Sequence, residues 1–189
     1  MEKLILASAS PRRTEIFNDL GLLYSVVPSN AQECTDETDP PRVVEALAKI
    51  KAENVYERTG GIVVSADTVV VLDGNIMGKP KDTENAKAML ASLSGRWHEV
   101  YTGICVKSKD KTVSRSCMTK VRFRQLSKDE IEKYVNTKEP MDKAGAYGIS
   151  GLGALLVEGI EGDFWNVVGF PISTFGEIMR KEFSIEIMP

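Results

Sequence analysis

The sequence predicts an α/β fold with a mixed, partly antiparallel central sheet flanked by helices. Three observations support this. The chain opens with a strand, a helix and a second strand, and the run from Ile62 to Leu72 is rich in β-branched residues, as in strands covered on both faces. A later region holds consecutive strands. With 189 residues and 42% hydrophobic content, the chain is long enough to bury a sizeable core, and we expect a single domain over residues 1–189.

The first part of the chain begins with a short apolar run from Lys3 to Ala7, which predicts a strand. Pro11 opens a helical pattern that stops at Gly21, because proline favours the first helical position and glycine the end. Leu22 to Val27 predicts a second strand. The stretch Gln32 to Pro41 combines four acidic residues with two prolines and therefore predicts a mobile loop.

A long helix is expected from Pro41 to Arg58, where the apolar residues fall at helical spacing. Lys51 lies four residues after Leu47 and so shares that apolar face. The lysine either points inward or toward a cleft, or it extends its ammonium group to water, as lysines on apolar faces commonly do.

After the strand Ile62 to Leu72, Asp73-Gly74 supplies a turn. Gly78-Lys79-Pro80 ends the short strand that follows, and Asp82 can cap a helix that runs to Ser94-Gly95. These signals predict a hairpin followed by a helix.

The remaining part of the chain predicts strands over Trp97 to Val106 and Cys117 to Phe123, the second alternating so that one face meets solvent. Ser127 and Glu130 have capping-box spacing for a helix. The rest is a glycine-rich segment from Asp142 to Gly153, two further strands over Ala154 to Ile160 and Phe164 to Gly169, and a short helix from Pro171 to Met179.

Composition excludes several classes of function. A net charge of -3 argues against broad binding to nucleic acid, and no apolar stretch reaches the 18 or so residues that span a bilayer, so we expect a cytoplasmic protein without a membrane partner. The cysteines Cys34, Cys105 and Cys117 show no CxxC spacing. Because there is one histidine, His98, and no GxSxG, we expect any catalysis to rest on carboxylates. We interpret His98, Trp97 and Trp165 as packing residues.

The segment Ser8 to Arg13 is a candidate phosphate site. A helix N-terminus there offers unsatisfied backbone N–H groups together with two hydroxyls and two guanidinium groups. Alternatively, Ser10 caps the helix and Arg12 and Arg13 are solvated. The pair of arginines favours the phosphate.

Asp67 lies in the middle of an apolar strand, where an ionised carboxylate costs several kcal/mol unless it is paired or faces a ligand. It is therefore a candidate catalytic residue. The alternative is that the strand ends early and Asp67 caps a turn through Thr68.

Two weaker signals follow. Lys79 could neutralise phosphate oxygens as a point charge. The glycines between Asp142 and Gly151 permit close backbone approach, as a base or phosphate pocket needs, although a tight irregular connection explains them equally well.

Together these segments, with Ser65-Ala66-Asp67-Thr68-Val69 and Ser94-Gly95, closely resemble the Maf family of nucleoside triphosphate pyrophosphatases. The resemblance extends from Leu4 to Gly169-Phe170-Pro171 and implies an elongated, two-lobed fold with a cleft, like that of inosine triphosphatases. It also implies frequent homodimers and cleavage of a nucleoside triphosphate to the monophosphate and pyrophosphate.

The resemblance assigns roles to particular residues. Asp67 would activate or orient water, and Glu33 and Asp67 would bind a divalent metal, Mg²⁺ or Mn²⁺. The groups that would contact the substrate are Ser8, Arg12, Arg13, Glu33, Lys51, Thr68, Lys79 and Ser150.

Within the family, the chain resembles the dTTP and UTP branch through its Ser-Pro-Arg-Arg, Ala-Asp-Thr and Lys-Ala-Gly-Ala-Tyr-Gly segments. It departs from that branch at Ser150, where glutamine is usual, so a shorter hydroxyl replaces an amide that could bond a pyrimidine edge. The alternatives are a non-catalytic nucleotide-binding regulator of cell division and a 7-methyl-GTP pyrophosphatase, which Arg12, Thr68 and Tyr147-Gly148 do not suit.

Overall fold

The computed structural model describes residues 3–188, and within them the chain divides into two compact units. The first unit comprises residues 3–67, 102–117 and 169–188, and the second comprises residues 68–101 and 118–168. The strands hydrogen-bond in the order β2-β1-β3-β5-β6-β7, with β4 paired to β3. Strands β3, β5 and β6 each contribute residues to both units.

The first unit contains parallel pairs of strands. Strand β1 (Leu4–Leu6) lies between β2 (Tyr24–Val26) and β3 (Ile62–Leu72) and is parallel to both. The second unit contains antiparallel pairs, β3 with β4 (Asn75–Met77) and β6 (Thr112–Phe123) with β7 (Val157–Glu161). The sheet is therefore mixed and partly antiparallel, as the sequence predicts. The remaining strand is β5 (Trp97–Lys107).

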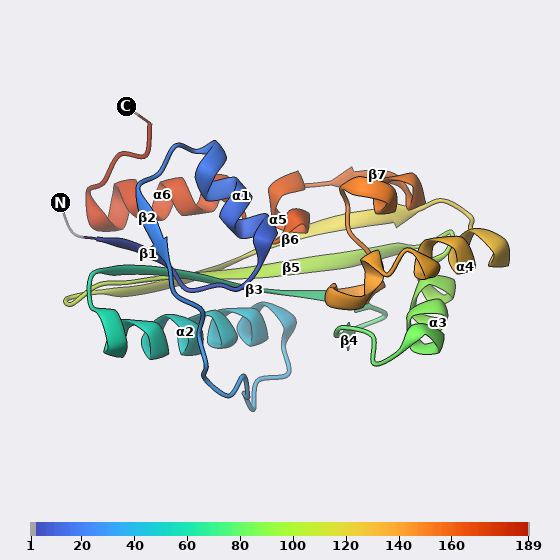
Figure 1. Ribbon diagram of the computed structural model, residues 1–189, viewed down its shortest axis with the longest axis horizontal. Coiled ribbons are helices and arrows are strands. Elements are labelled where there is room, and N and C mark those ends of the chain that lie inside the picture. Colours follow the sequence, from blue (N-terminus) through green and yellow to red (C-terminus); the bar gives the residue numbers. More distant parts are fainter. Residues whose placement is uncertain (1–2, 189) are drawn as a thin grey trace. The chain divides into compact units, whose positions relative to one another are not determined.

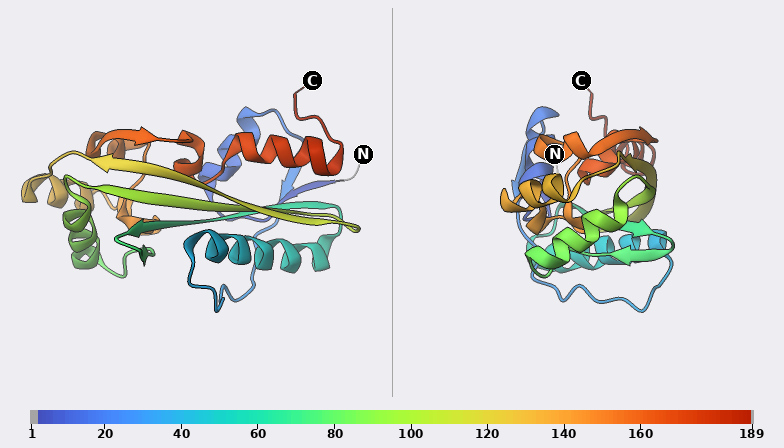
Figure 2. Two further views of the ribbon diagram at one scale, coloured as in Figure 1. Left: turned by 180° about the vertical axis from the view of Figure 1, so that it is seen from behind. Right: turned by 90° about the vertical axis from the view of Figure 1, so that its right-hand side faces the viewer.

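Helices cover both faces of the sheet in the first unit (Figures 1 and 2). The helix α2 (Pro40–Thr59) lies on one face, and α1 (Pro11–Asp19) and α6 (Ile172–Phe183) lie on the other. Phe17 of α1 packs against Phe170 and Phe175, with ring centroids 5.2 and 5.6 Å away. These contacts join the beginning of the chain to its last helix.

The second unit buries its core on one face of its strands. Helices α3 (Thr83–Leu93) and α4 (Lys128–Asn136) pack there with the 3-10 turns η1 (Glu139–Asp142), η2 (Ala144–Ala146) and η3 (Gly151–Leu156). As predicted, Asp82 caps α3, and Ser127 and Glu130 form a capping box on α4. Within residues 3–188, no helix has the length and apolarity needed to cross a bilayer.

One of the predicted strands is wrong, and another begins later than predicted. Residues Phe164 to Gly169 form a helix, α5 (Phe164–Val168), because Asp163 accepts a hydrogen bond from the backbone N–H of Trp165 and starts a turn. Part of Ala154 to Ile160 belongs to η3, so that strand begins at Val157. In both cases an apolar run indicated a strand where polar contacts bend the chain.

The two tryptophans, which we interpreted as packing residues, do not belong to the buried core, since Trp97 is 41% and Trp165 39% exposed. His98, by contrast, is buried, and its Nε2 shares a hydrogen bond of 2.7 Å with the Tyr147 hydroxyl. Phe123 packs edge-on against both rings. His98 is thus a packing residue, as predicted.

Burial gives His98 a pH-dependent effect on stability, because it lowers the pKa of the imidazole from 6.5 to about 4. Between those values the unfolded chain binds a proton that the native chain does not, so the free energy of unfolding falls as the pH falls. From pH 7 to pH 4.5 this loss is about 2 kcal/mol.

Urea unfolding at both pH values tests this effect of His98. The free energy of unfolding should fall by about 2 kcal/mol less in His98→Gln than in the wild type, because the glutamine amide can still bond Tyr147 but does not titrate. An identical loss in the wild type and in His98→Gln would show that His98 does not cause this pH dependence.

Candidate active site

The first unit gathers a buried ion pair around the carboxylate of Asp67. This residue lies in the middle of β3 and does not cap a turn. Its Oδ1 accepts a hydrogen bond of 2.6 Å from Nζ of Lys51, and the side chains are 13% and 12% exposed. Lys51 therefore does not extend to bulk water. Breaking such a pair by removing one partner costs about 3 to 5 kcal/mol.

Helix α2 is held against β3 close to this pair. The hydroxyl of Ser65 donates a hydrogen bond to the carbonyl of Ala48, one turn before Lys51. Because side chains alternate along a strand, Ser65 and Asp67 point to the same face of β3, toward α2. This docking brings together two residues that are 16 positions apart in the sequence.

Glu33 completes the cluster from an irregular loop between β2 and α2. Its Oε2 lies 3.0 Å from Nζ of Lys51, and its side chain is half exposed. The start of the loop is fastened to α2, because Asn54 accepts hydrogen bonds from Ser29 and from the backbone N–H of Asn30. Glu33 is thus brought to Lys51 by a segment without regular structure.

Arg13 lies beside these groups, held in place from two sides. Its Nε donates to the carbonyl of Gly169 at 2.8 Å, and its Nη1 donates to Oγ of Ser8 at 3.3 Å. Burial lowers the pKa of the Arg13 guanidinium to about 10, while the nearby Asp67 carboxylate opposes that shift. Arg13 therefore remains charged at neutral pH and is not a solvated arginine.

Ser10 occupies the N-cap position of α1, but its side chain makes no capping hydrogen bond to the N–H groups there. Instead, Ser8 is buried and accepts from the backbone N–H of Ser10 at 3.1 Å. Arg12 is partly buried in the first turn. Six of the predicted site residues, Ser8, Arg12, Arg13, Glu33, Lys51 and Asp67, therefore belong to the same unit.

The other three predicted residues belong to the second unit. Thr68 follows Asp67 directly on β3 and is partly buried. Lys79 is exposed between β4 and α3, and Ser150 is exposed where η3 begins. The residue before Lys79 is hydrogen-bonded to the glycine-rich segment. The backbone N–H of Gly145 donates to the carbonyl of Gly78 at 3.0 Å.

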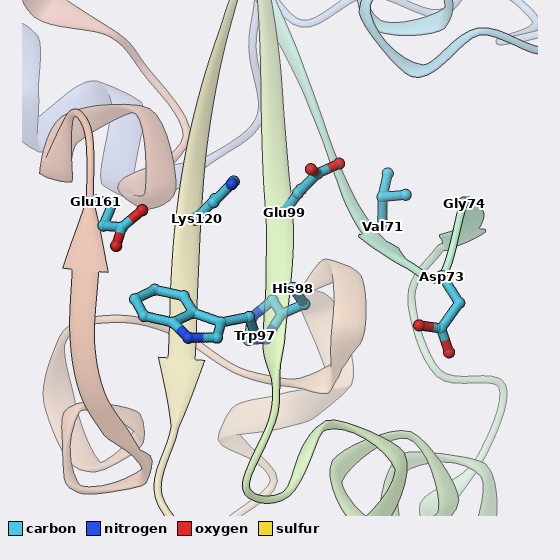
Figure 3. Close-up of a pocket in the computed structure, with 8 residues that line it drawn as sticks. All are labelled: Val71, Asp73, Gly74, Trp97, His98, Glu99, Lys120 and Glu161. Carbon is cyan, nitrogen blue, oxygen red and sulfur yellow. The ribbon is translucent and has the colours of Figure 1, made fainter.

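The second unit also has an open hollow of about 430 Å³ on the sheet face opposite its core (Figure 3). The indole of Trp97 forms part of its wall, beside Lys120 of β6 and Glu161 of β7. None of the predicted site residues lines this hollow.

Sequence reasoning missed two contacts around the predicted site residues. The carbonyl of Gly169 orients Arg13 from 156 residues away, and a backbone carbonyl leaves no signature in a sequence. Glu139, which accepts hydrogen bonds from the segment around Ser150, was also missed, although its position just before Pro140 and the glycine-rich segment was a weak signal.

Comparisons with known proteins agree with this architecture. The chain is 50% identical over 94% of its length to the dTTP/UTP pyrophosphatase of Thermosipho africanus, covering 92% of that protein. It is 49% identical over 96% of its length to the dTTP/UTP pyrophosphatase of Thermococcus onnurineus, covering 99% of it. The solved structure of the Staphylococcus aureus Ham1 protein shares the fold at 16% identity, with a TM-score of 0.51 over 80% of this chain and 78% of that one. The family described as Maf-like protein matches residues 3–182, and the chain belongs to this family.

Proposed function

We propose that this protein hydrolyses dTTP and UTP to the nucleoside monophosphate and pyrophosphate. The ion pair of Asp67 and Lys51 carries the proposal, because a carboxylate in the middle of a buried strand, paired with an ammonium group from the helix packed on it, is suited to catalysis at a phosphate. The names of the two relatives support the choice of nucleotides. A non-catalytic regulator of cell division would not need this pair.

The proposed reaction is attack of water on the α-phosphorus, which breaks the bond to the bridging oxygen and releases pyrophosphate. Lys51 bonds to Oδ1 of Asp67, so we assign Oδ2 to the water, whose proton the carboxylate accepts. Arg13 and Lys51 neutralise charge on the phosphate oxygens, with Ser8 as a hydroxyl donor. We assign Arg12, Thr68, Lys79 and Ser150 to further contacts with the nucleotide.

The residues present fit a divalent cation. Within residues 3–188, no cluster of three or more His, Cys, Asp or Glu side chains is arranged to hold a metal. However, Mg²⁺ is commonly held by one or two carboxylates together with the phosphates of a substrate, and Glu33 and Asp67 both converge on Lys51. These two carboxylates would hold Mg²⁺ or Mn²⁺, which would supply charge neutralisation on the polyphosphate. By the same family resemblance, we propose a homodimer.

The test is a panel of nucleotides that follows pyrophosphate release from dTTP, UTP, CTP, ITP and 7-methyl-GTP. Each is measured with Mg²⁺, with Mn²⁺ and with excess chelator, beside the Asp67→Asn variant. Release from dTTP and UTP that requires the metal and Asp67 supports the proposal. Preference for 7-methyl-GTP would overturn the choice of substrate, and no release from any nucleotide would overturn the activity.

Ser150 offers a test of base selectivity. Its exposed side chain stands where the related branch carries glutamine, so Ser150→Gln restores an amide that can donate to and accept from a pyrimidine edge. One added hydrogen bond corresponds to about a three- to tenfold gain. We therefore expect kcat/KM for UTP to rise by about that factor relative to CTP. Ser150→Ala is the matched control, and an unchanged ratio in Ser150→Gln would exclude contact between this position and the base.

A further inference from the structure

The turn η3 is capped in an unusual way. Ser150 occupies its N-cap position, where a serine hydroxyl normally accepts from the backbone N–H two or three residues later, yet its side chain makes no capping bond. The carboxylate of Glu139 takes that role. Its Oε2 accepts from the backbone N–H of Leu152 at 3.3 Å, and its Oε1 accepts from that of Gly153 at 3.1 Å.

Glu139 is held in turn by Tyr134 of α4. The Tyr134 hydroxyl donates to Oε1 of Glu139 at 2.9 Å and accepts from the backbone N–H of Gly148 at 3.2 Å. Burial raises the pKa of the Tyr134 phenol, so its hydroxyl keeps the proton that it donates. The two side chains therefore fasten the segment 148–153 at both ends, with Ser150 between the fastened points.

The ends of this segment also touch one another directly. A Cβ placed on Gly153 would lie 2.1 Å from the carbonyl oxygen of Gly148 and 2.7 Å from the Tyr134 hydroxyl. Only glycine permits this approach. The segment is thus a closed loop whose shape depends on backbone contacts and on the pair of Glu139 and Tyr134.

We propose that Glu139, held by Tyr134, is a positioning residue for nucleotide binding. By capping η3 in place of Ser150, it leaves the side chain at position 150 to face the nucleobase and fixes the backbone on both sides of it. The inference rests on the proposed hydrolysis of dTTP and UTP, and it adds the device that holds the base-recognition segment.

The first test compares steady-state kinetics of Glu139→Gln and Tyr134→Phe with the wild type, using UTP. In Glu139→Gln, an amide NH₂ group replaces one carboxylate oxygen and cannot accept from the backbone N–H group that this oxygen binds in the wild type. In Tyr134→Phe, the hydroxyl is removed and the ring is kept. We expect KM to rise about tenfold in each variant with kcat within about twofold, because positioning of the base affects binding more than chemistry. The double variant should be little worse than either single one.

The matched control is Glu182→Gln in the first unit, where the carboxylate also binds two partners, Lys111 and Arg115. It should lower the Tm without changing KM. If Glu139→Gln and Tyr134→Phe lower the Tm but leave KM unchanged, or if kcat alone falls, the positioning role is overturned. If Glu139→Gln does not fold, Tyr134→Phe alone decides. Absence of turnover in the wild type would instead overturn the proposed function on which this role rests.

A second test addresses the capping exchange without any nucleotide. In the Glu139→Gln background, the Ser150 hydroxyl is expected to turn to the N–H groups that Glu139 no longer satisfies. Adding Ser150→Ala should then lower the Tm further, whereas Ser150→Ala alone should not. Equal effects of Ser150→Ala in both backgrounds would overturn the capping role of Glu139.

Discussion

Asp67→Asn is expected to lower the turnover of dTTP and UTP by about a thousandfold, within the range contributed by a general base. The amide keeps an oxygen that can accept from Lys51, and Glu33 still lies 3.0 Å from the ammonium group. Folding should therefore be largely spared, with a Tm within a few degrees of the wild type. Pyrophosphate release and thermal unfolding, measured on the same preparations, separate the two effects.

Asp73→Asn is a suitable control, because Asp73 begins the turn after the same strand and pairs with Arg96 on the surface. Asparagine tolerates the positive φ of 51° found there. This variant should retain full turnover. Turnover in Asp67→Asn within tenfold of the wild type would remove Asp67 from the catalytic role.

Gly103→Ala is expected to destabilise the protein by about 3 kcal/mol and to reduce turnover as well. A Cβ at this position of β5 would lie 2.3 Å from the backbone carbon and oxygen of Val44 in α2. Backbone atoms cannot move aside by changing a rotamer, so α2 must shift. Because α2 carries Lys51, the shift reaches the pair with Asp67. A fall in Tm on the order of 10 °C should accompany the loss of activity.

Gly159→Ala in β7 provides the comparison, since nothing lies within 4 Å of the added Cβ. It makes the same chemical change within a strand and should leave the Tm equal or slightly higher. Similar Tm values for both variants would show that α2 does not depend on close approach to Gly103.

The elements with local signals were well predicted from the sequence. Proline at the start of α1, the cap at Asp82 and the capping box of α4 are interactions within a few residues, so they leave a pattern in the sequence. Helix α5 was missed because apolar content favoured a strand. Besides the local turn at Asp163, tertiary contacts hold this helix, as Asn166 is fully buried and donates to the carbonyl of Val100 and the hydroxyl of Thr119.

The same distinction applies to the candidate site. The sequence predicts that Asp67 is buried in a strand and needs a partner, and that Lys51 lies on an apolar helix face. Their pairing depends on how α2 docks on β3, which no local pattern encodes. The link between Glu139 and the segment after Gly148 is of the same kind.

The contact between Arg13 and Gly169 has a consequence for synthesis on the ribosome. The first unit is assembled from three separated stretches of chain. The ring of Phe17 therefore cannot pack against Phe170 and Phe175 until these residues have been synthesised. The second unit, in contrast, is complete once Val168 has emerged. Contacts between such distant residues form slowly, and a nascent chain lacking α6 exposes apolar surface that chaperones recognise. Arg13 thus acquires its final orientation only after Gly169 has emerged, so a nascent chain that stops before this residue would lack the oriented guanidinium that the proposed hydrolysis uses.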